Sequence, residues 1–255
     1  MRALLSALTL CATSALACGP DTDCPVADGS YRIRMPDGTP RGAIVFAHGY
    51  RGNAAGTMAS GGLERMAAEN GLALIALDSS GIDWDIPNHP GGRETRNEAA
   101  YVTAVRDDAA RRFGLDPARM VLSGFSAGGM LTWQMACDIP DAFPAFIPIS
   151  GTFWDPVPES CAAGSATIHH LHGTSDEVVP VGGRPIGDTA QGDVMAALEM
   201  WRAKGFDSAA EVTVADLDCE AWTDGADVLS YCTHPGGHGF EAEWLAELWG
   251  RTFPE

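Results

Sequence analysis

The chain has 255 residues, of which 45% are hydrophobic and 20% charged, so it can bury a sizeable core and is not a disordered polar chain. Its 30 glycines and 16 prolines are spread along the sequence, which excludes a collagen-like or low-complexity protein. The formal net charge of −18 repels nucleic acid and anionic membranes at long range, so we expect neither as a partner.

The first 17 residues have the pattern of a signal peptide. Arg2 gives a positive start, an uncharged run follows, and Ala15 and Ala17 put small residues at positions −3 and −1 of a cleavage site. The apolar run is too short to span a bilayer comfortably, and a buried N-terminal helix is the alternative. We therefore predict a secreted or periplasmic protein with a single domain over residues 18–255.

A lipoprotein anchored through Cys18 is a second possibility, because cleavage after Ala17 would make Cys18 the first residue. Lipidation signals usually have Leu three residues before the cysteine, and this chain has Ala15 there. The mature chain would keep an even six cysteines, and lipidation of one would leave another unpaired in an oxidising compartment. Soluble secretion is therefore favoured.

Six cysteines allow fifteen pairings, and a predicted hairpin favours the sequential one. Residues 217–224 and 227–234 flank Gly225-Ala226, with Gly first as a type II′ turn requires. In that register Cys219 faces Cys232 in a non-hydrogen-bonded pair, close enough for a disulfide. We predict the disulfides Cys18–Cys24, Cys137–Cys161 and Cys219–Cys232.

Short apolar segments alternate with segments of helical periodicity, which is typical of a mostly parallel sheet with helices on both faces. The sequence predicts strands over residues 43–47, 72–78, 120–124, 145–150, 167–172 and 211–217, followed by the hairpin. It predicts helices over residues 62–70, 101–113, 127–137, 194–204 and 240–249, and a long polar loop over 79–95.

The segment Gly124-Phe125-Ser126-Ala127-Gly128 matches the G-x-S-x-G nucleophile elbow. Alone the match is weak, but here it follows a predicted strand and opens a predicted helix, which is the sharp turn that presents the serine hydroxyl. A glycine-rich connection without chemistry is the alternative. We predict the α/β-hydrolase fold, with Ser126 as the nucleophile.

A serine nucleophile needs a base and an orienting acid, which follow it in chain order in this fold. Asp176 comes four residues after the predicted strand 167–172, at the strand end where sites in such sheets collect. Glu177 and Asp155 are rivals for the acid, and a loop-capping role is the alternative for Asp176.

His238 is the predicted base, because the glycines around it allow a loop to bend back over the serine. His234 is better interpreted as structural. His169, His170 and His172 resemble a metal cluster, but no carboxylates or cysteines accompany them at ligand spacing. We therefore expect buried, hydrogen-bonded histidines there, and no metal or cofactor.

Ester hydrolysis also needs hydrogen-bond donors for the oxyanion. We predict the backbone N–H groups of Ala127 and Tyr50 for this role, with His48 stiffening the turn. Aromatic residues that would line a substrate pocket, or simply belong to the core, are Trp84, Phe125, Trp133, Phe153 and Trp154.

Four segments carry a resemblance to a known family. They are Ala-His-Gly-Tyr-Arg-Gly-Asn at 47–53, Asp-Pro-Ala-Arg-Met at 116–120, Gly-Phe-Ser-Ala-Gly-Gly-Met at 124–130 and His-Gly-Thr-Ser-Asp-Glu-Val-Val-Pro at 172–180. Together they resemble the polyhydroxybutyrate depolymerase family, which shares its pattern with feruloyl and acetylxylan esterases. The resemblance covers about residues 40–240 and implies a secreted carboxylic ester hydrolase with the triad Ser126, Asp176 and His238.

Two departures from that family lie where a substrate would bind. Family members often have a Trp-Pro segment after Gly-His, whereas this chain has Gly237-His238-Gly239-Phe240, and the 79–95 loop is individual. The sequence thus leaves open whether a small ester, an oligomer or a polymer is the substrate, and it does not indicate the oligomeric state. A peptidase or thioesterase on the same fold and a non-catalytic binding protein are the alternatives.

Overall fold

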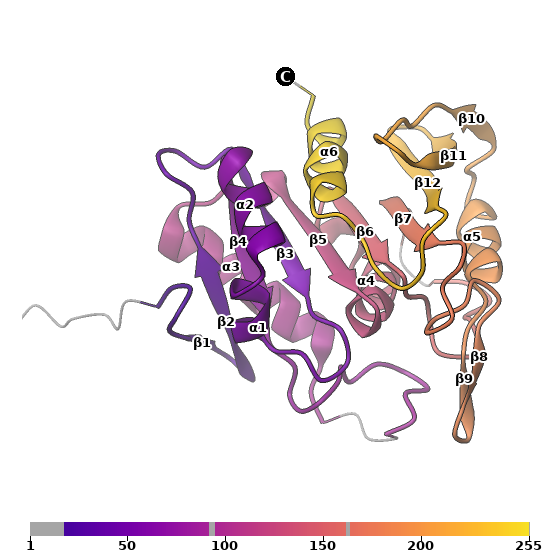
Figure 1. Cartoon of the computed structure of the whole chain (residues 1–255), viewed down its shortest axis with the longest axis horizontal. Coiled ribbons are helices and arrows are strands. Elements are labelled where there is room, and N and C mark those ends of the chain that lie inside the picture. Colours follow the sequence, from indigo (N-terminus) through magenta and orange to yellow (C-terminus); the bar gives the residue numbers. More distant parts are fainter. Residues whose placement is uncertain (1–17, 92–94, 162–163, 255) are drawn as a thin grey trace, which may run out of the picture.

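A ten-stranded sheet forms the centre of the molecule in the computed structural model, which describes residues 18–91, 95–161 and 164–254 (Figure 1). Its strands, in spatial order, are β1 (Cys24–Val26), β2 (Gly29–Arg34), β4 (Leu72–Leu77), β3 (Gly42–Ala47), β5 (Met120–Phe125), β6 (Ala145–Ile149), β7 (Thr167–Gly173), β12 (Asp227–His234), β11 (Asp218–Asp224) and β10 (Ser208–Ala210). A separate hairpin joins β8 (Arg184–Ile186) and β9 (Thr189–Gln191).

The middle of this sheet is parallel and its two edges are antiparallel. Neighbouring strands from β4 through β12 run parallel, while β1, β2, β11 and β10 pair antiparallel at the margins. The strand order reverses at β3, because β4 adds on one side and β5 on the other. Ligand sites in open sheets lie at such a switch point, outside the carboxyl ends of the strands.

Helices cover both faces of the sheet, as predicted. On β3 the side chains alternate, with Ile44 and Phe46 in one core cluster and Ala43, Val45 and Ala47 in the other. One cluster packs against α3 (Glu98–Phe113), α4 (Ala127–Asp138) and α5 (Val194–Arg202). The other packs against α1 (Ala54–Met58), α2 (Gly61–Glu69) and α6 (Glu243–Thr252).

The helix ends follow local sequence signals. The Asn97 side chain accepts a hydrogen bond from the Ala100 N–H and so caps the start of α3. Gly114, with φ 68°, ends that helix in the left-handed conformation that glycine adopts without strain. Asp193 caps α5 in the same way as Asn97 caps α3.

The predicted strand over residues 211–217 is wrong. The edge strand β10 occupies residues 208–210, and residues 211–214 have no regular structure. Val214 is buried in the same core cluster as α6, and the Ala215 N–H donates to the Glu247 carboxylate of that helix. This segment therefore satisfies its apolar and backbone groups through α6 instead of a strand ladder. The other predicted strands and helices start and end within about two residues of the observed ones, with two exceptions: α3 begins at Glu98, and α6 begins at Glu243 and ends at Thr252, three residues later than predicted at each end.

Three disulfides are present, Cys18–Cys24, Cys137–Cys161 and Cys219–Cys232, which are the pairs expected from the sequence. Cys219 faces Cys232 in the β11–β12 register, with their Cα atoms 4.0 Å apart. Gly225 in the connecting turn has φ 60° while Ala226 does not have a positive φ, as a type II′ turn requires. Because the Cys18 sulfur is bonded to Cys24, it is not available for a lipid anchor in this structure. The signal peptide predicted over residues 1–17 lies outside the described residues.

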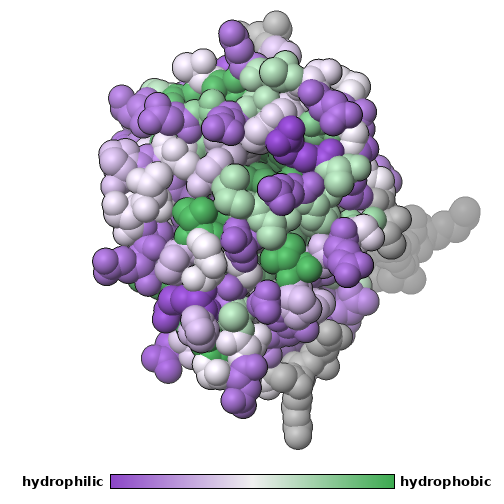
Figure 2. Space-filling view, turned by 90° about the vertical axis from the view of Figure 1, so that its right-hand side faces the viewer, coloured by the Kyte–Doolittle hydropathy of each residue, from purple (hydrophilic) through white to green (hydrophobic). Residues whose placement is uncertain are grey.

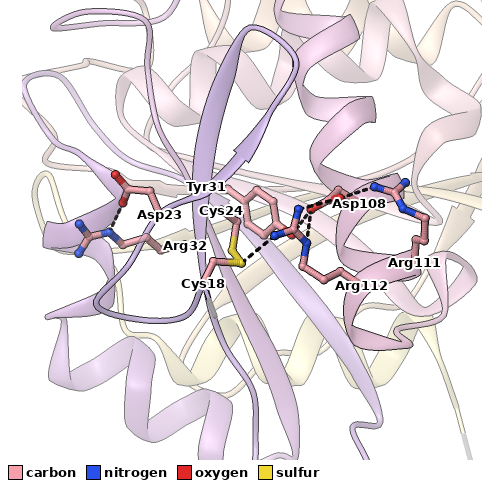
Figure 3. Close-up of a disulfide and its surroundings, with 8 residues drawn as sticks. All are labelled: Cys18, Asp23, Cys24, Tyr31, Arg32, Asp108, Arg111 and Arg112. Carbon is pink, nitrogen blue, oxygen red and sulfur yellow. Dashed lines mark hydrogen bonds and ion pairs between the residues drawn. A yellow bond between two sulfur atoms is a disulfide. The ribbon is translucent and has the colours of Figure 1, made fainter. Parts of the chain in front are cut away.

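The first disulfide lies beside a charged cluster that ties the N-terminal segment to α3 (Figure 3). The buried Asp108 carboxylate accepts a hydrogen bond from the Tyr31 hydroxyl at 2.8 Å and pairs with Arg111 and Arg112. An N–H of Arg112 also lies 3.3 Å from the Cys18 sulfur. Burial, followed by the bond to Asp108, raises the pKa of Tyr31 well above its usual range, so the phenol stays a donor.

Hydrophilic residues cover most of one face of the molecule, and apolar residues gather near the middle of that face (Figure 2). Within the described ranges we find no helix long and apolar enough to cross a membrane.

Candidate active site

The turn between β5 and α4 places Ser126 in an unusual backbone conformation. Its φ is 58° and its ψ −118°, a region that residues other than glycine rarely occupy. The Ser126 N–H donates to the Ile149 carbonyl of β6 at 2.8 Å, which holds the turn against the neighbouring strand. Helix α4 begins at the next residue, so the serine side chain stands at the carboxyl end of β5 and at the start of a helix.

Close packing of backbone explains the two glycines of this turn. A Cβ at Gly124 would lie 2.2 Å from the Gly128 carbonyl oxygen, and a Cβ at Gly128 would lie 2.1 Å from that of Ala47. Gly151 has the same constraint, because a Cβ there would lie 2.2 Å from the Ser126 carbonyl oxygen. Only glycine fits at these positions, and the sequence interpretation missed Gly151.

The chain after β3 runs directly beside the serine. A Cβ at Gly49 would lie 3.4 Å from the Ser126 Cβ. The N–H groups of Arg51 and Gly52 donate to the carbonyls of Ile82 and Gly49. In the part of the chain that the structure describes, the N–H groups of Tyr50 and Ala127 have no such acceptor and remain available to a ligand.

The His48 side chain stabilises this turn through hydrogen bonds on both ring nitrogens. Its Nε2 accepts from the Ser79 N–H at 3.3 Å, so its proton is on Nδ1, which donates to the Gly49 carbonyl at 2.8 Å. The Trp84 indole N–H donates to the His48 carbonyl at 2.9 Å, and the two rings are tilted by 34° with their centroids 4.6 Å apart. Burial lowers the pKa of His48, which keeps the ring neutral.

Asp176 follows β7, and its carboxylate is fully hydrogen-bonded. Oδ1 accepts from the N–H groups of Val178 and Val179 at 2.9 and 2.8 Å, and Oδ2 lies 2.7 Å from His238 Nδ1. Burial by itself would raise the pKa of Asp176, but the bond from His238 and these backbone bonds outweigh it and hold the pKa below its usual value. Asp176 is therefore an anion that fixes the tautomer of His238, with the Nδ1 proton directed at the carboxylate.

The loop that carries His238 is bound to the loop that carries Asp176. The N–H groups of Thr174 and Ser175 donate to the carbonyls of His234 and Gly236 at 2.8 and 3.0 Å. A Cβ at Gly173 would lie 2.3 Å from the Gly237 carbonyl oxygen, so the two loops touch through their backbones. Asp176 and His238 are therefore placed as one unit.

The His238 ring packs against Phe125, the residue before Ser126, with ring centroids 4.6 Å apart. Phe240 packs against Phe125 in turn at 5.3 Å. The rival acids Glu177 and Asp155 are exposed and do not contact His238. His234 packs on Trp244 and its Nδ1 accepts from the Gly236 N–H, in agreement with a structural role.

The three histidines of β7 are buried and hydrogen-bonded, as expected from the sequence. His169 Nδ1 bonds to the Ser230 hydroxyl, while His170 and His172 bond to each other on the opposite face. Across the described residues, no group of three or more His, Cys, Asp or Glu side chains is arranged to hold a metal ion.

The predicted pocket aromatics have different environments. Trp84 and Trp133 are 1% and 0% exposed, so neither ring is accessible to a substrate in this structure. Phe153 and Trp154 are also buried, and both border a small cavity of about 120 Å³ beside Pro156. Phe125 is partly exposed beside His238, and Tyr50, the predicted oxyanion residue, is 52% exposed.

A hollow of about 690 Å³ lies beside His238, and the sequence interpretation did not identify it. It is bordered by His234, His238, Phe240 and Trp244. The sequence placed Phe240 and Trp244 on the last helix, and only the fold of the 235–241 loop brings them to His238.

Comparison with solved structures identifies the architecture. An acetyl xylan esterase from Aspergillus awamori superposes with a TM-score of 0.62 at 16% identity, covering 87% of this chain and 93% of that one. The chain has the α/β-hydrolase fold.

Sequence relatives of this α/β-hydrolase agree with the resemblance seen in its motifs. A phospholipase/carboxylesterase family model matches residues 96–197. Feruloyl esterase B of Thermothelomyces thermophilus is 31% identical over 52% of this chain and 46% of its own length. Poly(3-hydroxyalkanoate) depolymerase C of Paucimonas lemoignei is 30% identical over 46% of this chain and 30% of its own length.

The similarity to feruloyl esterases and hydroxyalkanoate depolymerases is thus confirmed. The aligned part of this chain spans less than two thirds of the length of these relatives.

Proposed function

We propose that the protein is a secreted serine carboxylic ester hydrolase in which Ser126 is the nucleophile, His238 the base and Asp176 the orienting acid. The observation that carries this proposal is the 2.7 Å contact between His238 Nδ1 and Asp176 Oδ2, with the His238 ring packed 4.6 Å from that of Phe125, the residue before the strained Ser126. The esterases among the relatives support the same class of reaction.

The reaction begins when the Ser126 Oγ attacks the ester carbonyl carbon and His238 Nε2 takes the hydroxyl proton. His238 can accept at Nε2 because Asp176 holds the single proton of the neutral ring on Nδ1. The oxyanion of the tetrahedral intermediate accepts hydrogen bonds from the N–H groups of Tyr50 and Ala127. The intermediate collapses as the alcohol leaves with the proton from His238. Water, activated by the same histidine, then hydrolyses the acyl-enzyme and restores Ser126. No cofactor takes part.

The substrate proposed is an ester, whether small, oligomeric or polymeric. Phe125, Phe240 and Trp244 give the surroundings of His238 an apolar, aromatic character that suits an acyl or alcohol group with an apolar part. The formal net charge of −18 disfavours a polyanionic substrate.

Export to an oxidising compartment is the second part of the proposal. Disulfides persist outside the cytosol, and all six cysteines among the described residues are paired. The predicted signal peptide is consistent with this compartment.

The test of the proposed function is hydrolysis of p-nitrophenyl acetate, butyrate and octanoate and of methyl ferulate by wild type and Ser126→Ala. We expect kcat/KM to fall by about 10⁴-fold or more in the variant, since removal of the nucleophile removes the acyl-enzyme route. Ser175→Ala, an exposed serine next to Asp176, is the matched control and keeps wild-type activity.

The alternatives give different results in the same assay. If wild type and Ser126→Ala are equally inactive and a fluorophosphonate leaves the wild type unlabelled, the protein is a non-catalytic binding protein. Equal activity in both would mean that another residue is the nucleophile. Faster cleavage of matched amides or thioesters than of esters would indicate a peptidase or thioesterase.

A further inference from the structure

A chain of hydrogen bonds leads from the core on α4 to the acid of the candidate triad. The Trp133 indole Nε1 lies 3.0 Å from His170 Nδ1, and His170 Nε2 lies 3.0 Å from His172 Nδ1. His172 Nε2 then lies 2.8 Å from the Val179 carbonyl oxygen and 3.6 Å from Asp176 Oδ2. Trp133, His170 and His172 are each 0% exposed, so water does not offer alternative partners.

The Trp133 indole, the first group in this series, fixes the direction of every hydrogen bond that follows it. An indole nitrogen can only donate, so His170 Nδ1 must be an unprotonated acceptor. The His170 proton is therefore on Nε2 and is donated to His172 Nδ1. His172 Nδ1 must then also be an unprotonated acceptor, which leaves its one proton on Nε2. That N–H points at the Val179 carbonyl and the Asp176 carboxylate.

We propose that His172 is a positioning residue for Asp176. The hydrogen bonds from Trp133 and His170 hold His172 in a single neutral tautomer, whose Nε2–H faces the loop that carries Asp176 and Val179. Both backbone groups of Val179 are hydrogen-bonded, because its N–H donates to Asp176 Oδ1 and its carbonyl accepts from His172. Without the second bond, Val179 would be free to move and would carry the Asp176 carboxylate with it.

The neutral state of His172 matters as much as its position. Asp176 Oδ2 faces both histidine rings, His238 at 2.7 Å and His172 at 3.6 Å. A second cation at 3.6 Å would compete for the carboxylate charge that stabilises the His238 imidazolium during the reaction. Because His172 is held neutral, the negative charge of Asp176 stabilises the His238 imidazolium alone.

The charged and titratable groups around the pair agree with a neutral state. His172 faces Asp176 from its own loop and His238 and His234 from the chain at the end of β12. His170 faces His172 and packs against the Tyr231 ring of β12 at 5.8 Å, while Trp133 faces it from α4. Burial is the main cause that lowers the pKa of both histidines, and Asp176 and the Val179 carbonyl only partly oppose it at His172.

The first experiment does not depend on enzymatic activity. Long-range ¹H–¹⁵N spectra of protein labelled at histidine nitrogens report the tautomer of each ring, with assignment by His170→Asn and His172→Asn. We expect both rings to be neutral with the proton on Nε2 from pH 5 to 9. A proton on Nδ1 of His172, or its protonation between pH 6 and 8, would overturn the proposal.

The second experiment rests on the proposed function and removes only the indole donor. In Trp133→Phe, His170 Nδ1 becomes free to take a proton, so we expect kcat on p-nitrophenyl acetate to fall about threefold or more between pH 8 and 5.5 beyond the wild-type fall, with KM little changed. Trp201→Phe is the matched control, since Trp201 is equally buried in the same cluster but donates to the Ala166 carbonyl.

The outcomes separate the two proposals. Identical pH profiles for Trp133→Phe and Trp201→Phe would overturn the positioning role, while the Ser126→Ala comparison tests the esterase itself. If Trp133→Phe does not fold, the spectra of the wild type still decide whether His170 and His172 are held in the neutral tautomer with the proton on Nε2.

Discussion

Ser126 and the Asp176 carboxylate are held in place by different physical means. On the β5 side, Ser126 is fixed by contacts between backbones so close that Gly124, Gly128 and Gly151 admit no side chain. On the β7 side, Asp176 is fixed by hydrogen bonds from Val178, Val179 and His238.

Steric contact and hydrogen bonding respond differently to mutation. A methyl group added to a close backbone contact must displace whole strands and helices, whereas loss of one hydrogen bond leaves the others in place. A substitution of Asp176 should therefore abolish activity without unfolding the protein. Around Ser126, by contrast, a single added methyl group should lower stability.

The largest effect after Ser126→Ala should come from Asp176→Asn. The amide keeps the shape and can still accept from Val178 and Val179, but it removes the charge that fixes the His238 tautomer and stabilises its imidazolium. We expect kcat/KM to fall by about 10³–10⁴-fold with a cooperative unfolding transition retained. Glu177→Gln, at the exposed neighbouring position, serves as the control and stays within about threefold of wild type. Comparable losses in both variants would show that Asp176 is not the acid.

The next effect, on stability, should come from Gly128→Ala. The new Cβ would meet the Ala47 carbonyl oxygen at 2.1 Å, so β3 and α4 must move apart. We expect the free energy of unfolding, measured by urea denaturation, to fall by about 3 kcal/mol. Gly250→Ala in α6 is the matched helix control, because a Cβ there meets nothing within 4 Å, and it should raise stability by about 0.5–1 kcal/mol. A neutral Gly128→Ala would contradict the steric account of the elbow.

A smaller effect should be seen in the pH dependence of the free energy of unfolding, through His169 on β7. Burial lowers the pKa of His169 from 6.5 to about 4, so the unfolded chain binds a proton before the folded one does. The stability from this group is full above pH 6.5 and is lost as the pH falls toward 4. Between pH 7 and 5 we expect wild type to lose about 2 kcal/mol more than His169→Asn. Equal pH slopes in urea titrations of the two proteins would show that His169 is not held neutral.

Most of the sheet and the local conformation at its strand ends could be predicted from the amino-acid pattern. The strands from 43 to 173 are apolar and short, and the G-x-S-x-G motif has few backbone conformations open to it, so local pattern was sufficient. The hairpin register that pairs Cys219 with Cys232 also followed from a two-residue turn. Where local pattern failed, as over residues 211–217, an alternating Val-x-Val segment was bound by α6 instead of a neighbouring strand.

Which polar groups contact one another depends on the three-dimensional fold. Asp176 and His238 are 62 residues apart, and Trp133 and His170 are 37 apart. The four-residue spacing of His172 and Asp176 was visible in the sequence, but nothing local shows that the chain between them turns so that both face one loop. Contacts of this kind depend on how parallel strands and their loops align side by side. The residue types indicate the class of chemistry. The packing of β5, β7 and the loop after β12 decides which of these residues come into contact.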